Sequence, residues 1–167
     1  VAAKILPEES QEIMEQLQKT LEPISKISPF GQCFYIFLNN TTSAIFTILL
    51  GVFFGVFPFL SVFSNGEVIG MLAFLLSDTI SPLRFLAGIL PHGIFEIPVL
   101  IMAGAMGMKI GRLMIEKIFS KKNIDIKKEL SQSFNFFFRF LFPLLAAAAL
   151  IEVFITPHIF YYYFFYF

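Results

Sequence analysis

The distribution of apolar residues constrains the fold of this chain more than any other feature of its sequence. Apolar stretches with few charged residues recur along it, and each can form a helix that crosses the roughly 30 Å hydrocarbon core of a bilayer in about 20 residues. Charged residues make up 14% of the chain, whereas soluble domains average roughly 25%. The sequence therefore predicts an all-α fold, a polytopic transmembrane helical bundle with about four spanning segments: 34–63, 68–90, 91–108 and 134–155.

The residues on either side of these segments have a different composition. Over residues 1–29, apolar side chains recur at helical spacing and glutamates occupy the other positions, which predicts an amphipathic surface helix. Residues 158–167 are rich in Tyr and Phe, which predicts an aromatic interfacial tail. The transmembrane domain then covers 30–157. Because the chain begins with Val1 rather than Met, we expect further residues upstream.

Basic residues indicate the orientation in the membrane. Residues 109–130 contain seven basic and three acidic residues, more positive charge than any other connection. Positively charged connections stay in the cytoplasm, so we expect the loop over 117–130 to be cytoplasmic in a multi-pass protein of the cell membrane. Alternating spans then place Asn39, Asn40, His92 and the end of the fourth segment near the outer side.

The stretch LPHGIFEIP, residues 90–98, places two ionisable groups at the edge of an apolar segment. If a helix is continuous from Pro91, His92 and Glu96 are four residues apart and share one face. If the helix begins nearer Phe95, Pro98 falls in its first turn, where the missing N–H is tolerated. Ionisable groups in hydrocarbon are unfavourable, so their presence indicates a site.

Other segments contribute polar residues at a similar depth. We expect one shared polar cluster or binding site beneath the outer surface, although the asparagine pair also fits a helix cap. His and carboxylate side chains can hold a divalent metal, with one position left open for water. The candidate metal ligands are therefore His92, Glu96 and Glu152, and the full predicted cluster is Asn39, Asn40, His92, Glu96 and Glu152.

Glycines recur at spacings that suit close helix packing. Gly51 and Gly55 form a small-xxx-small pair, and Gly104, Gly107 and Gly111 lie along one stripe of a helix. We expect both sets to contact other helices, either within the chain or across a homodimer.

The sequence also predicts where the chain turns or bends. Asn65, Gly66 and Glu67 predict a tight turn between the first and second segments. The second segment is either one helix kinked at Pro82 or two half-helices that form a re-entrant hairpin. A further kink is expected at Pro143 in the fourth segment.

These motifs together resemble the stage II sporulation protein M family, over about residues 34–157. The resemblance implies a multi-spanning helical membrane protein. The family's named member belongs, in spore-forming bacteria, to a membrane complex with peptidoglycan-degrading partners. Members often have another spanning helix upstream. The residues that carry the resemblance are Asn39–Asn40, Gly51, Gly55, Pro58, Asn65–Gly66, Gly70, Pro91–Gly93, Glu96, Pro98, Gly104, Gly107, Gly111, Glu152 and Thr156–Pro157.

Three functions remain open from the sequence. The first is a non-enzymatic scaffold of a cell-envelope complex, with the lipid bilayer, other membrane proteins or a second copy as partners. The second is a channel, transporter or permease-like subunit whose path is lined by the polar cluster. The third is a metal-dependent membrane hydrolase. The absence of a basic patch argues against nucleic-acid binding, and the absence of a Gly-rich phosphate loop argues against an ATPase.

Overall fold

A computed structural model of the chain describes residues 15–16, 19, 22–23, 26–77, 80–120 and 123–166. The side chains of His92, Phe160 and residues 163–166 are outside this description. Every regular element in the described ranges is helical, so the prediction of an all-α fold is confirmed. Most of the surface helix predicted over residues 1–29 lies outside the described residues.

Four stretches are long and apolar enough to cross a membrane, as predicted: Pro29–Val52, Val56–Leu76, Gly93–Phe119 and Ile126–Phe154. Two of them are interrupted by short helices of another type, a 3-10 helix (η1) and a π-helix (η2). The elements are α2 (Pro29–Leu49), η1 (Leu50–Val52), α3 (Val56–Leu76), α4 (Pro82–Phe119), α5 (Ile126–Phe136), η2 (Phe137–Leu141), α6 (Phe142–Phe154) and α7 (Thr156–Tyr166).

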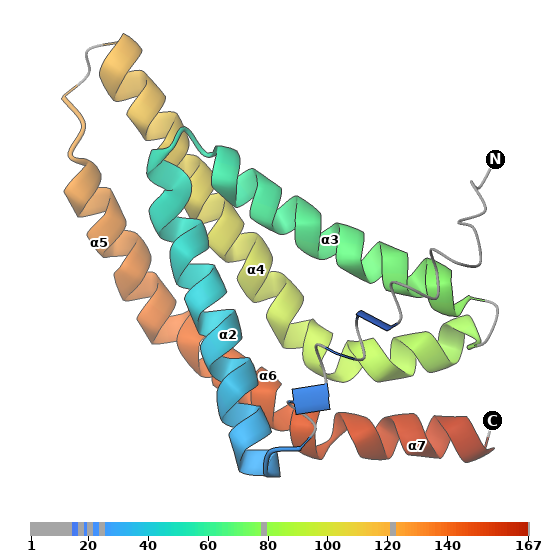
Figure 1. Cartoon of the computed structure of the whole chain (residues 1–167). Coiled ribbons are helices and arrows are strands. Elements are labelled where there is room, and N and C mark those ends of the chain that lie inside the picture. Colours follow the sequence, from blue (N-terminus) through green and yellow to red (C-terminus); the bar gives the residue numbers. More distant parts are fainter. Residues whose placement is uncertain are drawn as a thin grey trace, which may run out of the picture.

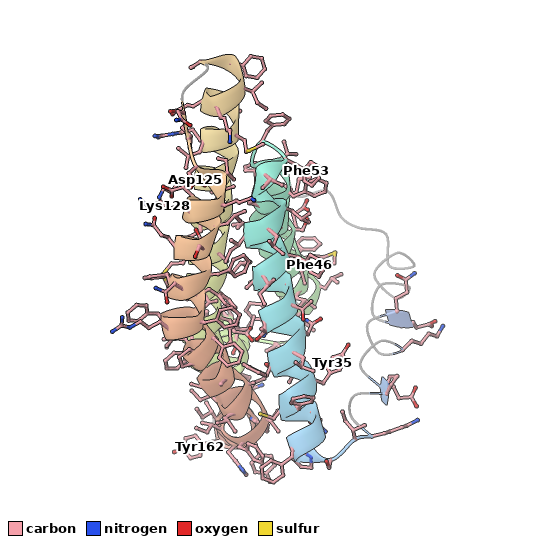
Figure 2. The ribbon with its side chains drawn as sticks, turned by 90° about the vertical axis from the view of Figure 1, so that its left-hand side faces the viewer. Tyr35, Phe46, Phe53, Asp125, Lys128 and Tyr162 are labelled. Carbon is pink, nitrogen blue, oxygen red and sulfur yellow. The ribbon has the colours of Figure 1, made fainter. Side chains whose placement is uncertain are left out.

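Helix α4 is the centre of the arrangement, because it contacts α2, α3, α5, α6 and α7. Figure 1 shows α3 on one flank and α5 on the other, with α2 and α4 between them. We call the end of the bundle that holds the α2–α3 turn and the α4–α5 connection the basic end, and the opposite end the far end. Figure 2 shows Phe53 of the turn near the same end as Asp125 and Lys128 of α5. At the far end, α7 and the first turns of α4 run across the bundle (Figure 1).

Three helices begin at a side chain that caps the backbone. In each, an oxygen of Ser28, Ser81 or Asp125 accepts a hydrogen bond from the backbone N–H three residues later. Pro29 and Pro82 follow the two serines, in the first helical position, where a proline removes no helical hydrogen bond. These short polar signals therefore fix where α2, α4 and α5 start.

The first reversal of the chain differs from the predicted one. The predicted segment over 34–63 is divided between α2 and α3, and the chain turns at Phe53–Gly55. Phe54 and Gly55 have φ values of 58° and 76°, a left-handed conformation that glycine adopts without a steric penalty. The predicted turn at 65–67 was wrong, because those residues lie inside α3.

The second predicted segment is also divided differently. Residues 68–76 complete α3, and a connection leads to α4, which begins at Pro82 and stays helical through Pro91 and Pro98. Prolines inside a helix remove hydrogen bonds and bend it. Figure 1 shows α4 running across the far end before it turns into the bundle. His92 and Glu96 therefore belong to one helix, four residues apart.

In the fourth span, the π-helix η2 ends at Leu141, two residues before Pro143. Proline has no N–H to donate to the carbonyl four residues earlier, here that of Arg139. A wider π turn is one way in which a helix continues past such an interruption. The chain thus continues from α5 into α6 across the site where the sequence predicts a kink.

The α2–α3 turn lies directly on the backbone of α4 through four glycines. A Cβ atom built on Gly51 would lie 2.8 Å from the Cα of Gly107, and one built on Gly111 would lie 2.5 Å from the Cα of Gly55. Real Cβ atoms do not approach backbone atoms so closely, so only glycine fits at these contacts. Gly104 continues the same stripe, since its Cβ would lie 2.5 Å from Cγ2 of Val62.

Side-chain packing and polar links complete the bundle. The Thr47 and Ser61 hydroxyls lie 2.9 Å apart and join α2 to α3. Lys109 of α4 forms an ion pair with Glu129 of α5 at 2.7 Å, near the basic end. The buried apolar core lies between α2, α4 and the fourth span and contains Ala44, Ile48, Val99, Ala103, Ile110, Phe137, Leu141 and Leu145.

The glycine contacts predict that adding one methyl group at the contact greatly lowers the stability of the fold. Gly111→Ala should lower the free energy of unfolding by at least about 2 kcal/mol, because the new Cβ meets backbone that cannot move aside. Gly93→Ala on the same helix is the matched control, since its Cβ would lie 3.4 Å from the nearest side-chain atom. Thermal unfolding in detergent, followed by circular dichroism, measures both. Equal melting temperatures for the two variants would contradict the packing described.

Candidate functional site

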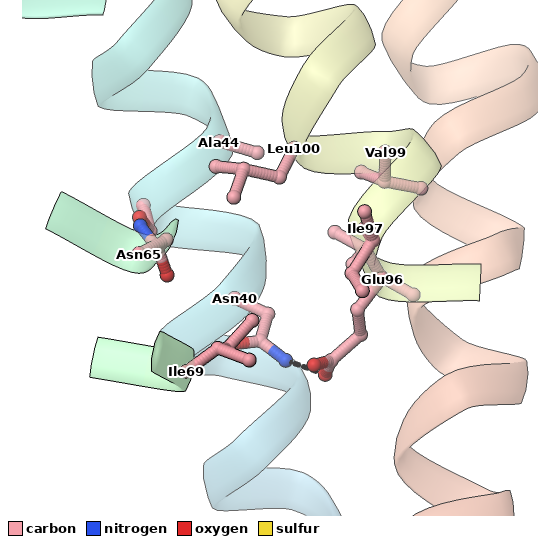
Figure 3. Close-up of a pocket in the computed structure, with 10 residues that line it drawn as sticks. Asn40, Ala44, Asn65, Ile69, Glu96, Ile97, Val99 and Leu100 are labelled. Atoms are coloured by element: carbon pink, nitrogen blue, oxygen red, sulfur yellow. Dashed lines mark hydrogen bonds between the residues drawn. The ribbon is translucent and has the colours of Figure 1, made fainter. Parts of the chain in front are cut away.

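A hydrogen bond between two spanning helices joins α2 to α4 at a partly buried carboxylate. The side-chain N–H of Asn40 donates to Oε1 of Glu96, and both residues are half-buried (Figure 3). Asn40 lies near the middle of α2 and Glu96 follows the bent start of α4. A carboxylate removed from water needs such a donor, because an unpaired one is strongly unfavourable in hydrocarbon. This bond therefore anchors the candidate site.

A cavity of about 90 Å³ adjoins this hydrogen bond. Figure 3 shows Asn65 and Ile69 of α3 on one side of it, with Glu96 projecting from α4. Its walls mix polar and apolar groups from four helices. They are Asn40, Ser43, Ala44, Asn65, Ile69, Glu96, Ile97, Val99, Leu100 and Leu145.

Asn65 is a member of the site that the sequence analysis placed in a turn. In the structure it lies inside α3, with its amide nitrogen donating to the carbonyl oxygen of Ser61 at 2.8 Å. The glycine pair Gly51 and Gly55 could have indicated this position. If the chain is predicted to reverse at this pair, residue 65 falls in the middle of the next spanning helix.

Glu152 of α6 is the acidic side chain that the fourth span contributes to the predicted cluster. Glu152 is half-buried and has further interactions of its own. That Glu152 shares one cluster with Glu96 stays a prediction. The Asn40–Glu96 hydrogen bond is a polar contact between otherwise apolar helices.

The other two predicted members are placed differently. Asn39 is exposed, whereas its neighbour Asn40 is half-buried against Glu96. The backbone of His92 lies one helical turn before Glu96, but its side chain is outside the described residues. The structure thus brings Asn40 and Glu96 together and leaves Asn39 exposed, while a shared cluster with His92 and Glu152 stays a prediction.

The described side chains contain no group of three His, Cys, Asp or Glu residues that could hold a metal ion. The predicted ligand set of His92, Glu96 and Glu152 includes the undescribed imidazole, so this set stays a prediction. The cavity is small compared with ligand pockets, which typically measure about 300–1,000 Å³. It has room for a few water molecules that could bond to the polar groups around it.

Comparison with known proteins identifies one family. The pattern of the stage II sporulation protein M family matches residues 1–157, so the predicted resemblance is confirmed. An uncharacterized protein of Methanocaldococcus jannaschii is 35% identical over 124 residues, which cover 73% of this chain and 70% of that relative. No solved structure matches the chain significantly.

The adjacent asparagines provide a matched test of the site. Asn40→Leu should lower the free energy of unfolding by about 1–3 kcal/mol, because it leaves the Glu96 carboxylate without its donor. Asn39→Leu replaces an exposed side chain on the same helix and should change the free energy of unfolding by less than about 0.5 kcal/mol. Combining Asn40→Leu with Glu96→Leu should recover part of the loss, since both partners are then apolar. Thermal unfolding in detergent measures the stability of each variant. Equal losses of stability for Asn39→Leu and Asn40→Leu would contradict the contact between Asn40 and Glu96.

Proposed function

Because this chain belongs to the stage II sporulation protein M family, we propose that it is a non-enzymatic integral membrane scaffold of a cell-envelope complex. The observation that carries this proposal is that the partly buried carboxylate is bonded within the chain itself. The Glu96 carboxylate is bound by Asn40 of the same chain, beside a cavity of about 90 Å³. A polar network satisfied in this way stabilises one arrangement of helices and needs no ligand.

The packing of the bundle supports the same proposal. Glycine contacts hold the α2–α3 turn on the backbone of α4, and such backbone contacts leave little freedom for the two parts to move against each other. A transporter that alternates between two states needs helices or repeats that move relative to one another. A scaffold instead needs a fixed surface.

A permease-like subunit is the second candidate, and one observation favours it. Amide and carboxyl groups of three spanning helices, Asn40, Asn65 and Glu96, adjoin one cavity. Such groups often mark paths for ions or protons in membrane proteins. The metal-dependent hydrolase has no comparable support among the described side chains, because its ligand set depends on His92.

The proposed orientation places the basic end in the cytoplasm. Residues 117–130 comprise the end of α4, the connection and the start of α5, and they include five basic and two acidic residues. The positive-inside rule then puts them on the cytoplasmic side of the cell membrane. The α3–α4 connection lies at the opposite end of the bundle, which becomes the outer side.

Reconstitution separates the scaffold from the permease. Purified protein in liposomes loaded with a pH-sensitive dye should give no proton flux above that of empty liposomes. The Glu96→Gln variant, which keeps the shape of the side chain, should behave identically and should retain the same co-purifying envelope proteins in the same ratio. A flux that Glu96→Gln abolishes would overturn the scaffold proposal and favour the permease.

Labelling tests the orientation. In a Cys33→Ser background, a membrane-impermeant maleimide added outside intact cells should modify a cysteine introduced by Ser81→Cys and spare one introduced by Asn123→Cys. Both positions are exposed in the structure, so access depends on the side of the membrane. Permeabilised cells provide the control, because both positions should then react. The reverse pattern in intact cells would invert the orientation.

A further inference from the structure

Two exposed charged side chains lie far from the ends of spanning segments, whereas the other exposed charges in the described spans lie near the basic end. Glu67 belongs to α3 and Arg139 to η2, and both are exposed. Among the described residues, neither has a hydrogen-bonding or ion-pairing partner, and Arg139 contacts only the ring of Phe140, 5.5 Å from its centroid. Both charges would therefore face lipid in an isolated copy of the chain.

Contacts near the basic end provide a common reference for depth. The Cβ position of Gly111 in α4 falls against Gly55, at the start of α3. Lys109, two residues deeper in α4, is paired with Glu129 of α5 at 2.7 Å. These two contacts bring α3 and α5 to nearly the same level relative to α4.

Measured from this reference, the two charges lie at the same depth. Glu67 follows Gly55 by 12 residues, and Arg139 follows Glu129 by 10 residues from a level that is two residues deeper. At a rise of about 1.5 Å per residue, each lies roughly 18 Å from the level of Gly111. This is near the middle of a hydrocarbon core of about 30 Å. A glutamate side chain is too short to reach the interface from there.

The two charges cannot meet within one copy. Pro58 and Asn65 on the inner face of α3 pack toward α4 and the cavity, and Glu67 lies on the opposite face. Phe137 and Leu141 are buried completely on the inner face of η2, and Arg139 lies between them in sequence and faces outward. Figure 1 shows α3 and α5 on opposite flanks, with α2 and α4 between them.

We propose that copies of this chain associate side by side in the membrane, with Glu67 of one copy paired with Arg139 of the next. Charge complementarity favours a second copy as the occupant, since the chain itself supplies opposite charges at equal depth on opposite flanks. Each charge in hydrocarbon needs an opposite partner, and this contact provides both at once. Because the contact joins different surfaces of the two copies, it generates a ring or a row.

The direction of the helices permits this contact between copies that share one orientation. Both α3 and the fourth span run from the basic end to the far end, so paired helices are parallel (Figure 1). Ser64 precedes Glu67 by three residues, and Phe136 precedes Arg139 by three residues. Ser64 of one copy therefore lies level with Phe136 of the next. Both positions are exposed. Gly66 and Gly70 have open space where a Cβ would lie, so a neighbouring helix can approach α3 closely. This inference does not depend on the scaffold function.

Cross-linking between two differently tagged copies tests the proposal. In a Cys33→Ser background, one copy carries Ser64→Cys and the other carries Phe136→Cys, and membranes are oxidised before solubilisation. The mixed dimer should form, and neither variant expressed alone should form a dimer. Glu67→Arg or Arg139→Glu, introduced in both copies, should reduce the yield about tenfold or more. Glu67→Arg combined with Arg139→Glu should restore it, and Lys127→Glu, an exposed charge outside the apolar part of the span, should leave it unchanged.

Several results would overturn the proposal. A cross-link between two Ser64→Cys copies would place two α3 helices face to face. If the folded protein has the mass of a monomer and gives no mixed cross-link, the partners of Glu67 and Arg139 are lipid head groups or another protein. A yield insensitive to the charge reversals would remove the ion pair from the contact. Where a reversal lowers the melting temperature, Glu67→Gln and Arg139→Gln serve instead, and an undiminished yield in both would also contradict the pairing.

Discussion

The contact between glycine backbones on the α2–α3 turn and on α4 is the constraint on which the rest of the structure depends. It requires Gly51 and Gly55 to face Gly107 and Gly111 with no side chain between them. Inside a bilayer, helices gain no hydrophobic energy from contacting each other, so association depends on close packing. Because the turn is fixed against α4 at this level, the positions of all residues farther along α2 and α3 follow.

The candidate site is one consequence of that register. Asn40 lies on α2 and Asn65 on α3, each at a distance from the turn that brings it beside Glu96. A shift of one helical turn in α2 would separate the amide of Asn40 from the carboxylate. The polar contact in turn favours this register, because separating the two residues would take this donor away from a carboxylate in hydrocarbon. Backbone packing and polar pairing therefore specify the same arrangement.

The charged groups of the spans fall into two kinds. Glu96 is hydrogen-bonded to Asn40 inside the bundle. Glu67 and Arg139 point outward at mid-depth on opposite flanks. The inner groups define how the chain folds, and the outer groups define how the folded chain meets its surroundings. A scaffold requires both properties, since a fixed interior keeps the outer charges at a constant depth and spacing.

The sequence by itself determined the class, the family, the number of spans and the residues that carry polar chemistry, because hydrocarbon restricts composition strongly. It also indicated the close-packing glycines, since spacing alone places them on one helix face. Only the tertiary structure decided that the chain reverses at Phe53–Gly55 and not at Asn65–Glu67. Both stretches have turn-forming residues, and local preferences do not distinguish them. The choice depends on which reversal lets α3 pack on α4 and places Asn65 at the cavity, and this is a contact between residues far apart in the chain.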